Sequence, residues 1–135
     1  MKRYIKSNSE ELAKHVIEGM FARKAQDVVS MDMRNTDSSI CDYFIICSGE
    51  SNTQVDSIAN SVIDEVKNNL NEKALHTEGL ENAYWVLVDF GNVVVHVFQQ
   101  EYRNFYKLED LWADSQLTVH KDPLAQRESV PTNRR

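Results

Sequence analysis

The chain has 135 residues, of which 41% are hydrophobic and 27% are charged, with two cysteines and a net charge of −6. This length suits one domain with a core of moderate size, and the composition is typical of a globular protein. No run of about 18 apolar residues is present, so we expect no membrane-spanning helix. The N-terminus turns polar where a signal peptide is apolar, and two cysteines are too few for a disulfide framework or a zinc site. These features predict a cytoplasmic protein with no membrane partner.

Charge is distributed unevenly along the chain. Residues 119–135 contain four basic and two acidic residues, which leaves a net charge of −8 on residues 1–118. Proteins that grip a nucleic-acid backbone normally present a basic face. The acidic body therefore argues against direct binding of DNA or RNA and suits a basic protein partner, although such charge can also serve solubility alone. Residues 119–135 lack periodicity and contain both prolines, which predicts a domain over 1–118 and a disordered tail over 119–135.

The first predicted element is a helix that begins near residues 7–9, where Ser7 and Glu10 have capping-box spacing. A strand is predicted from Asp27 to Met33. The run from Asp42 to Ser48 is short and almost continuously apolar, which is typical of a central strand buried on both faces. The apolar stripe of the helix consists of Leu12, Ala13, Val16, Ile17 and Met20.

A second helix follows the turn at Gly49, and Ser51 and Gln54 are placed to cap its start. A strand followed by a turn, a helix and further strands predicts a crossover connection. Residues 76–80 predict only a weak strand or a bridging loop. The stripe of this second helix consists of Val55, Ile58, Val62, Val66 and Leu70.

A β-hairpin is predicted from Tyr84 to Phe98, with a two-residue turn at Gly91-Asn92 that sets the register so that Trp85 faces Phe98. Because side chains alternate between the faces of a strand, one face is purely apolar and should meet the helices. That apolar face consists of Val86, Val88, Phe90, Val93, Val95 and Val97. The opposite face, which we call the hairpin face, consists of Trp85, Leu87, Asp89, Val94, His96 and Phe98.

A last helix is predicted over about 102–113, with an apolar stripe of Phe105, Leu108, Leu111 and Trp112. The order of elements is then a helix, two strands, a helix, a weak strand, a hairpin and a helix. This order predicts a single α+β domain in which a mixed β-sheet of about five strands packs with three main helices.

Nucleotidyl transfer is the first chemistry that the pattern suggests. Ser48-Gly49 leads from a strand into a helix start, where backbone N–H groups can bind phosphate. Metal-dependent transfer also needs paired carboxylates to hold Mg²⁺, and the chain contains no two acidic residues separated by one position. Glu50 also stands where it would repel a phosphate. We therefore expect no enzyme activity and no catalytic residues, and a nucleotide-binding relic that uses residues 48–51 is the alternative function.

Cysteine and histidine chemistry is also poorly supported. Cys47 falls in the predicted central strand, where a thiol behaves as a small hydrophobic group, and no histidine is close in sequence to Cys41. His96 and Asp89 share the hairpin face, but that face supplies no third polar ligand. We therefore expect no metal and no cofactor, and a histidine that faces solvent or a partner.

Trp85 is the residue that most strongly suggests a partner. It can pack as core beneath a helix, or it can anchor a protein interface, where tryptophan is enriched. The all-apolar opposite face of the hairpin already provides a core, which favours the interface. A pure dimerisation module that buries Trp85 at a symmetric interface is a third reading.

Four blocks of sequence occur together over about residues 9–114. They are Asp42-Tyr-Phe-Ile-Ile-Cys-Ser-Gly-Glu-Ser-Asn-Thr-Gln-Val, Glu78-Gly79, Trp85-Val-Leu-Val-Asp-Phe-Gly-Asn-Val-Val-Val-His-Val-Phe and Arg103-Asn-Phe-Tyr-Lys-Leu-Glu-Asp-Leu-Trp. In order and spacing these blocks resemble the ribosomal silencing factor family, which is also called the Iojap-related family. Glu50 and His76-Thr77 depart from the residues that are commonest in the family.

The resemblance implies a nucleotidyltransferase-like topology without catalysis. It further implies binding to the large ribosomal subunit through its universal ribosomal protein fourteen, a steric block of small-subunit joining, and repression of translation under nutrient limitation. A homodimer of the free protein is also implied. Among the positions that match the family motifs, the partner-binding candidates are Trp85, Asp89, His96, Arg103, Tyr106 and Glu109.

Overall fold

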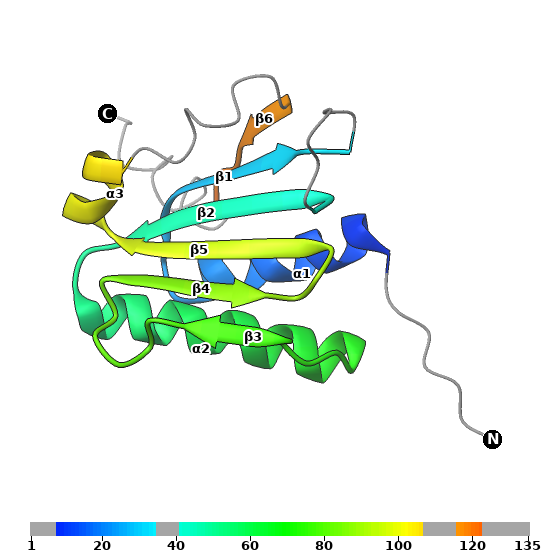
Figure 1. Cartoon of the computed structure of the whole chain (residues 1–135), viewed down its shortest axis with the longest axis horizontal. Coiled ribbons are helices and arrows are strands. Elements are labelled where there is room, and N and C mark those ends of the chain that lie inside the picture. The colour runs from blue at the N-terminus through cyan, green and yellow to red at the C-terminus, as the bar shows by residue number, and fades with distance from the viewer. Residues whose placement is uncertain (1–7, 35–40, 107–115, 123–135) are drawn as a thin grey trace, which may run out of the picture.

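The computed structural model describes residues 8–34, 41–106 and 116–122. Its strands form one six-stranded sheet in the order β3-β4-β5-β2-β1-β6 (Figure 1). The central pair, β2 and β5, is parallel and the other neighbours are antiparallel, so the predicted α+β fold with a mixed sheet is confirmed. The elements in chain order are α1 (Ser9–Ala22), β1 (Gln26–Asp32), β2 (Tyr43–Gly49), α2 (Asn52–Leu70), β3 (His76–Glu78), β4 (Trp85–Asp89), β5 (Val93–Gln99), α3 (Gln100–Tyr106) and β6 (Gln116–Val119).

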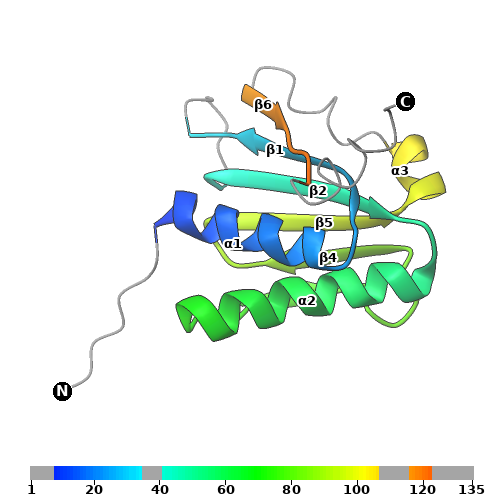
Figure 2. The same ribbon diagram turned by 180° about the vertical axis from the view of Figure 1, so that it is seen from behind.

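Helices α1 and α2 cover one face of the sheet. They lie behind the sheet in Figure 1 and in front of it in Figure 2. The apolar face of the hairpin packs against both helices, as predicted, and the residues from the two strands and the two helix stripes form one buried cluster. Its fully buried members include Leu12, Val16, Ile58, Val62, Val86, Val88, Val93, Val95 and Val97.

The two long helices begin at capped residues. The N-cap of α1 is Asn8, whose side chain accepts a hydrogen bond from the backbone N–H of Glu11 at 2.8 Å. The predicted start near residues 7–9 is confirmed, but the cap is Asn8 and not Ser7. In α2 the prediction is confirmed in detail, because Ser51 Oγ accepts from the N–H of Gln54 at 3.1 Å.

The centre of the sheet follows the crossover that the sequence predicts. Strand β2 is buried along nearly its whole length, and the chain passes through α2 before it returns in β5, parallel to β2. The hairpin register is also as predicted, with Trp85 opposite Phe98 and Asp89 opposite Val94. The backbone N–H of Phe90 closes the turn on the carbonyl of Val93 at 2.9 Å.

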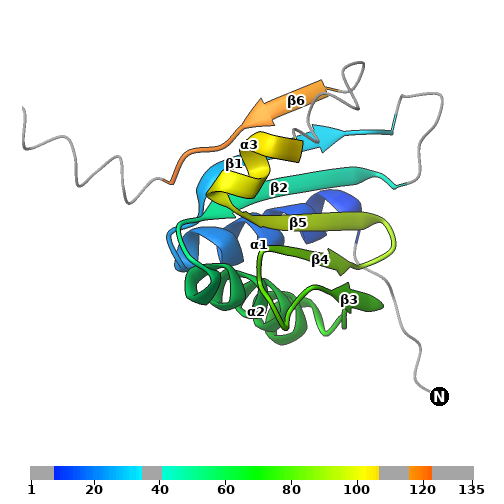
Figure 3. The ribbon, with the colours of Figure 1, turned by 60° about the vertical axis from the view of Figure 1, so that its left-hand side comes forward.

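The sheet has one strand more than predicted. Residues 116–119 form β6, which pairs with β1 at the edge (Figure 3), and the N–H of His120 bonds to the carbonyl of Val28 at 2.9 Å. The predicted last helix starts two residues early, at Gln100, and its part beyond residue 106 lies outside the described residues. Among the described residues no helix is both long enough and apolar enough to cross a membrane.

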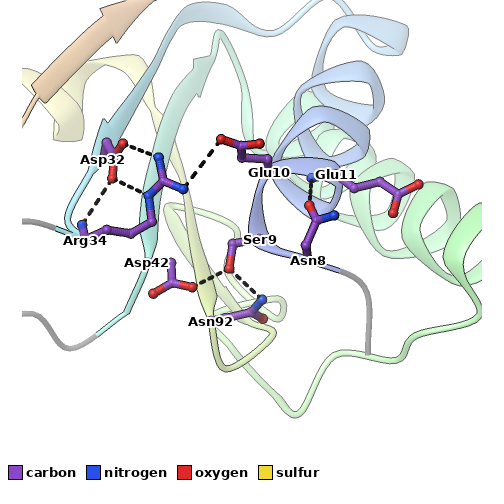
Figure 4. A network of polar contacts seen from close by, with 8 residues as sticks. All are labelled: Asn8, Ser9, Glu10, Glu11, Asp32, Arg34, Asp42 and Asn92. Atoms are coloured by element: carbon purple, nitrogen blue, oxygen red, sulfur yellow. Dashed lines mark hydrogen bonds and ion pairs between the residues drawn. The ribbon is translucent and has the colours of Figure 1, made fainter. Parts of the chain in front are cut away.

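The start of α1 is tied to the sheet by a polar network (Figure 4). Ser9 Oγ donates to the carboxylate of Asp42 and accepts from Nδ2 of Asn92 at 2.9 Å. Arg34 pairs with Asp32 at 2.7 Å, and this hydrogen-bonded pairing holds the pKa of Asp32 below its usual value. The network fixes α1 against the hairpin turn.

Candidate partner-binding face

The hairpin face lies on the side of the sheet opposite α1 and α2. Burial alternates along β4, where Val86 and Val88 are buried and Trp85, Leu87 and Asp89 are half-buried. On β5, Val94 is half-buried, whereas His96 and Phe98 are buried. The structure therefore brings the three predicted hairpin residues Trp85, Asp89 and His96 onto one side, as expected from the pleat.

Trp85 is held in a fixed orientation by two neighbours from β5. Its ring stacks on Phe98, with ring centroids 4.9 Å apart and planes inclined by 25°. Its indole Nε1–H donates a hydrogen bond to Nδ1 of His96 at 2.8 Å. Because the indole N–H is already hydrogen-bonded within the protein, a partner could cover the ring without leaving that N–H unpaired. A half-buried tryptophan of this kind suits an interface anchor.

His96 is buried beneath this tryptophan, with 8% of its surface exposed. The expectation was a histidine that faces solvent or a partner, and the burial shows that His96 does not face solvent. Burial lowers the pKa of His96 to about 4, so the imidazole is neutral near pH 7. Because Nδ1 accepts from Trp85, the ring proton lies on Nε2. Phe44 from β2 also packs on the ring, at 4.5 Å between centroids. His96 is therefore held in place within the sheet and positions the indole of Trp85 through their hydrogen bond.

Asp89 stands at the end of β4 next to the turn. Its Oδ1 accepts a hydrogen bond from the backbone N–H of Gly91 at 2.7 Å, so the carboxylate stabilises the turn while it remains half-exposed. Glu78 lies nearby on the neighbouring strand, where it forms a 2.7 Å pair with His76. This edge of the face thus carries two carboxylates, and His76, which is directly opposite Asp89, pairs with one of them.

Arg103 is built into the protein interior. It is 8% exposed, and its Nη1 donates to the backbone carbonyl of Asp27 at 2.5 Å and to Ser48 Oγ at 3.0 Å. Asp27 lies at a register shift between β1 and β2 and has a positive φ of 53°. Arg103 therefore satisfies the carbonyl that the bulge turns away from the ladder, and we assign it a structural role.

Two of the predicted contact residues are not placed. Glu109 and the side chain of Tyr106 lie outside the described residues. The backbone of Trp85 is in close contact with Gly79 on the neighbouring segment. A Cβ on Gly79 would lie 2.2 Å from the carbonyl oxygen of Trp85, and the φ of Gly79 is +87°, so only glycine fits there.

Other strands extend the hairpin face, which sequence reasoning did not predict. In the sheet register Ile46 stands beside His96 and Phe44 beside Val94. These residues join a second buried cluster that Trp85, Val94 and Tyr102 flank. At the far edge β6 contributes two exposed apolar residues, Leu117 and Val119, which are 45% and 61% exposed. Their alternation with Thr118 is the only local signal that could have identified this strand.

The start of α2, the place for a nucleotide in the alternative function, is already hydrogen-bonded within the chain. The N–H of Glu50 donates to the side-chain oxygen of Gln54 at 2.7 Å, and the N–H of Gln54 donates to Ser51. Ser48 is fully buried and bonded to Arg103. Phosphate binding there would have to displace these contacts, so the geometry does not favour it.

The two cysteines are buried thiols. Burial raises the pKa of Cys47, as expected for a small hydrophobic group in a central strand, and raises that of Cys41 to about 11. Neither thiol is therefore a thiolate near neutral pH.

A groove of about 410 Å³ lies on the helical side, between α1 and the β1–β6 edge. Ser30 and His120 line it and hydrogen-bond to each other at 2.7 Å. Of the predicted contact residues that the structure describes, none lines this groove, which has an apolar wall of Ala13, Ile17, Phe21 and Tyr43.

Comparison with known proteins gives a consistent result. The family model described as "Ribosomal silencing factor during starvation" matches residues 6–135. The chain is 44% identical over 96 residues to Ribosomal silencing factor RsfS of Bacillus subtilis, covering 70% of this chain and 79% of the relative. It is 40% identical over 111 residues to RsfS of Halalkalibacterium halodurans, covering 80% and 91%.

The fold agrees with a solved structure from Chromobacterium violaceum. The TM-score is 0.75 at 33% identity, covering 86% of this chain and 95% of that one. The family match over nearly the whole chain, the identity to its named members and the shared fold lead to one conclusion: this chain belongs to the ribosomal silencing factor family.

Proposed function

We propose that this chain binds the large ribosomal subunit through its universal ribosomal protein fourteen and prevents the small subunit from joining. In this way it represses translation when nutrients are scarce. Membership of the ribosomal silencing factor family supports this assignment. The observation that carries the binding site is the half-buried Trp85, stacked on Phe98 and hydrogen-bonded to His96 at 2.8 Å.

The rigidity of the face favours tight docking. Trp85 and Asp89 stand on a strand that is paired on both sides, with β3 and β5, and the indole is fixed by two contacts. A side chain that is already ordered loses little conformational entropy on binding, so more of its contact energy contributes to affinity.

Charge supports a basic protein as the partner. Asp89 and Glu78 lie at the same edge of the face, and the body of the chain carries a net charge of −8. Complementary charge accelerates association and orients the partner, whereas the negative phosphates of ribosomal RNA would be repelled. The partner is therefore a protein surface and not the RNA beside it.

The mechanism is steric and requires no chemical step. With the hairpin face docked on the large subunit, α1 and α2 on the opposite face of the sheet (Figure 2) would project into the space that the small subunit must occupy. The chain acts as a binding protein in the cytoplasm, and steric blocking by itself needs no cofactor. A homodimer of the free protein would bury the same half-exposed tryptophan, so dimerisation and ribosome binding would compete.

Co-sedimentation with separated ribosomal subunits tests this function. The purified full chain is centrifuged with large or with small subunits, and subunit joining is then followed by light scattering. We expect binding to the large subunit alone and reduced joining. Binding to neither subunit, or binding to the large subunit with normal joining, would contradict the proposal, and binding of a nucleotide would then be measured for the alternative function.

A further inference from the structure

A cluster of three metal-ligating side chains lies between the two long helices, away from the hairpin face. His15 and Glu18 come from α1, and Glu65 comes from α2. The Nδ1 atom of His15 lies 3.0 Å from Glu65 Oε2 and 3.3 Å from Glu18 Oε1, and all three ligand atoms lie within 4.8 Å of one another. The side chains of His15 and Glu65 are 19% and 28% exposed, whereas that of Glu18 is 49% exposed, so two of the three ligands are partly withdrawn from solvent.

The positions of these side chains are fixed by the packing of the helices. His15 and Glu18 are three residues apart and so share one face of α1. Glu65 is brought to them because α1 and α2 approach closely at Gly19, where an added Cβ would lie 2.9 Å from Cα of Val62. Ser61 Oγ also donates to the carbonyl of Gly19 at 2.8 Å.

A further contact orients the ligand from α2. Nδ2 of Asn69, one turn further along α2, donates at 3.0 Å to Glu65 Oε2, the same oxygen that lies 3.0 Å from His15 Nδ1. Hydrogen bonds of this kind to a ligating carboxylate are typical of metal sites, where they fix the orientation of the ligand.

The two spacings that involve His15 fit a small metal ion, and the three ligand atoms together lie within 4.8 Å of one another. Ligands about 2.1 Å from a tetrahedral Zn²⁺ lie about 3.4 Å from one another, and the two distances from His15 Nδ1 are within half an ångström of that value. One imidazole and two carboxylates suit Zn²⁺, whereas Mg²⁺ prefers oxygen ligands alone. We propose that His15, Glu18 and Glu65 bind one divalent transition-metal ion, Zn²⁺ being the ion tested, with water completing the coordination.

The same geometry has a simpler alternative, which the experiment must exclude. A protonated His15 can donate from Nδ1 to Glu65 and attract Glu18 as an ion pair without any metal. The two readings differ in what Zn²⁺ does. A metal site binds Zn²⁺ with one-to-one stoichiometry and joins α1 to α2, whereas an ion pair gains nothing from the ion.

Isothermal titration of the metal-free full chain with zinc chloride near pH 7 tests the site. We expect one Zn²⁺ per chain, and no comparable binding of Mg²⁺. His15→Gln and Glu65→Gln each remove one ligand and should weaken binding by about 100-fold or more, because even the loss of a supporting hydrogen bond costs 10–100-fold. Asp64→Asn is the matched control, since Asp64 is exposed next to Glu65 on the same helix, and it should leave binding unchanged.

Thermal unfolding provides a second readout that does not rely on heats of binding. Zn²⁺ at a large excess over its dissociation constant should raise the melting temperature of the wild type and of Asp64→Asn by several degrees, but not that of His15→Gln. The absence of Zn²⁺ binding by the wild type, or equal binding by His15→Gln, would overturn the proposal; the latter would place the ion elsewhere, for example at His76 and Glu78. The experiment contains no ribosome, so its outcome is independent of the proposed function.

Discussion

The indole N–H of Trp85 donates to the Nδ1 of His96 across the hairpin, at 2.8 Å. The two residues are not directly opposite in the register, because Trp85 faces Phe98 and His96 faces Leu87. The bond therefore runs diagonally between two successive residue pairs on the same face of the hairpin, a distance that long aromatic side chains can span. It couples the half-buried indole of the hairpin face to a buried, neutral imidazole.

Trp85→Ala should weaken binding to the large subunit by about 2 kcal/mol or more, as expected when a central aromatic anchor is truncated. The measurement is a binding titration with labelled chain, accompanied by circular dichroism to verify the fold. Leu75→Ala is the control, because Leu75 is an apolar residue that is 70% exposed and belongs to no part of the hairpin face. A folded Trp85→Ala variant that binds like the wild type would remove Trp85 from the interface.

Asp89→Asn should slow association with the large subunit and make the rate less sensitive to salt. The amide keeps an oxygen that can accept from the N–H of Gly91, so the turn is preserved while the negative charge is lost. Stopped-flow measurements over a range of salt concentrations test this, with Asp64→Asn on the helical side as a control of equal charge change. If both variants slow association equally, net charge and not the edge of the hairpin face guides docking.

Acid should destabilise the protein through His96. Burial lowers the pKa of His96 to about 4, while in the unfolded chain it is near 6.5. As the pH falls, the unfolded state therefore binds a proton at His96 before the folded state does. The stability that the neutral imidazole contributes is fully present above about pH 6.5 and is lost as the pH falls toward 4, by up to about 3 kcal/mol.

The variant His96→Asn isolates this effect. Asparagine does not titrate, and its oxygen can still accept from the indole of Trp85. Urea unfolding of both proteins between pH 7 and pH 4 should show the free energy of unfolding of the wild type falling relative to that of His96→Asn. A difference that stays constant across this range would mean that the pKa of His96 is the same in the folded and the unfolded protein.

Arg103→Ala should destabilise the fold by about 2–4 kcal/mol, because it leaves the carbonyl of Asp27 and the hydroxyl of Ser48 without this buried donor. Chemical denaturation measures the loss, and Arg23→Ala, an exposed position at the end of α1, is the control. If Arg103→Ala retains full stability but loses ribosome binding, Arg103 is a contact residue after all.

Gly19→Ala should cost about 1–3 kcal/mol of stability, since the new methyl would meet the backbone of Val62 and Ser61 at 2.9–3.1 Å and the helices would have to separate. Thermal unfolding tests this against Lys14→Ala, an exposed position on the same helix. Because Glu65 reaches His15 only through this close approach, Gly19→Ala should also weaken Zn²⁺ binding. A stability equal to that of the wild type would show that the helices can shift without penalty.

Periodicity along the sequence was enough to predict most of the scaffold. The stripe of α2, its cap at Ser51 and the register of the hairpin follow from residues that are near one another in the chain, and local patterns of this kind determine local structure. The apolar face of the hairpin was placed correctly for the same reason. The missed elements had weak local signals: β6 has only four residues, and the cap at Asn8 competed with a neighbouring serine.

What only the tertiary structure decided is the environment of individual side chains. The sequence places His96 on the hairpin face, but its burial depends on Trp85 and on Phe44, a residue more than fifty positions away. Arg103 matches a family motif, but its role follows from a bulge near Asp27. Burial and hydrogen bonding depend on which distant segments pack together. The sequence by itself therefore determined the helices and all the strands but β6, and the packing of the sheet decided which of their polar groups remain available to a partner.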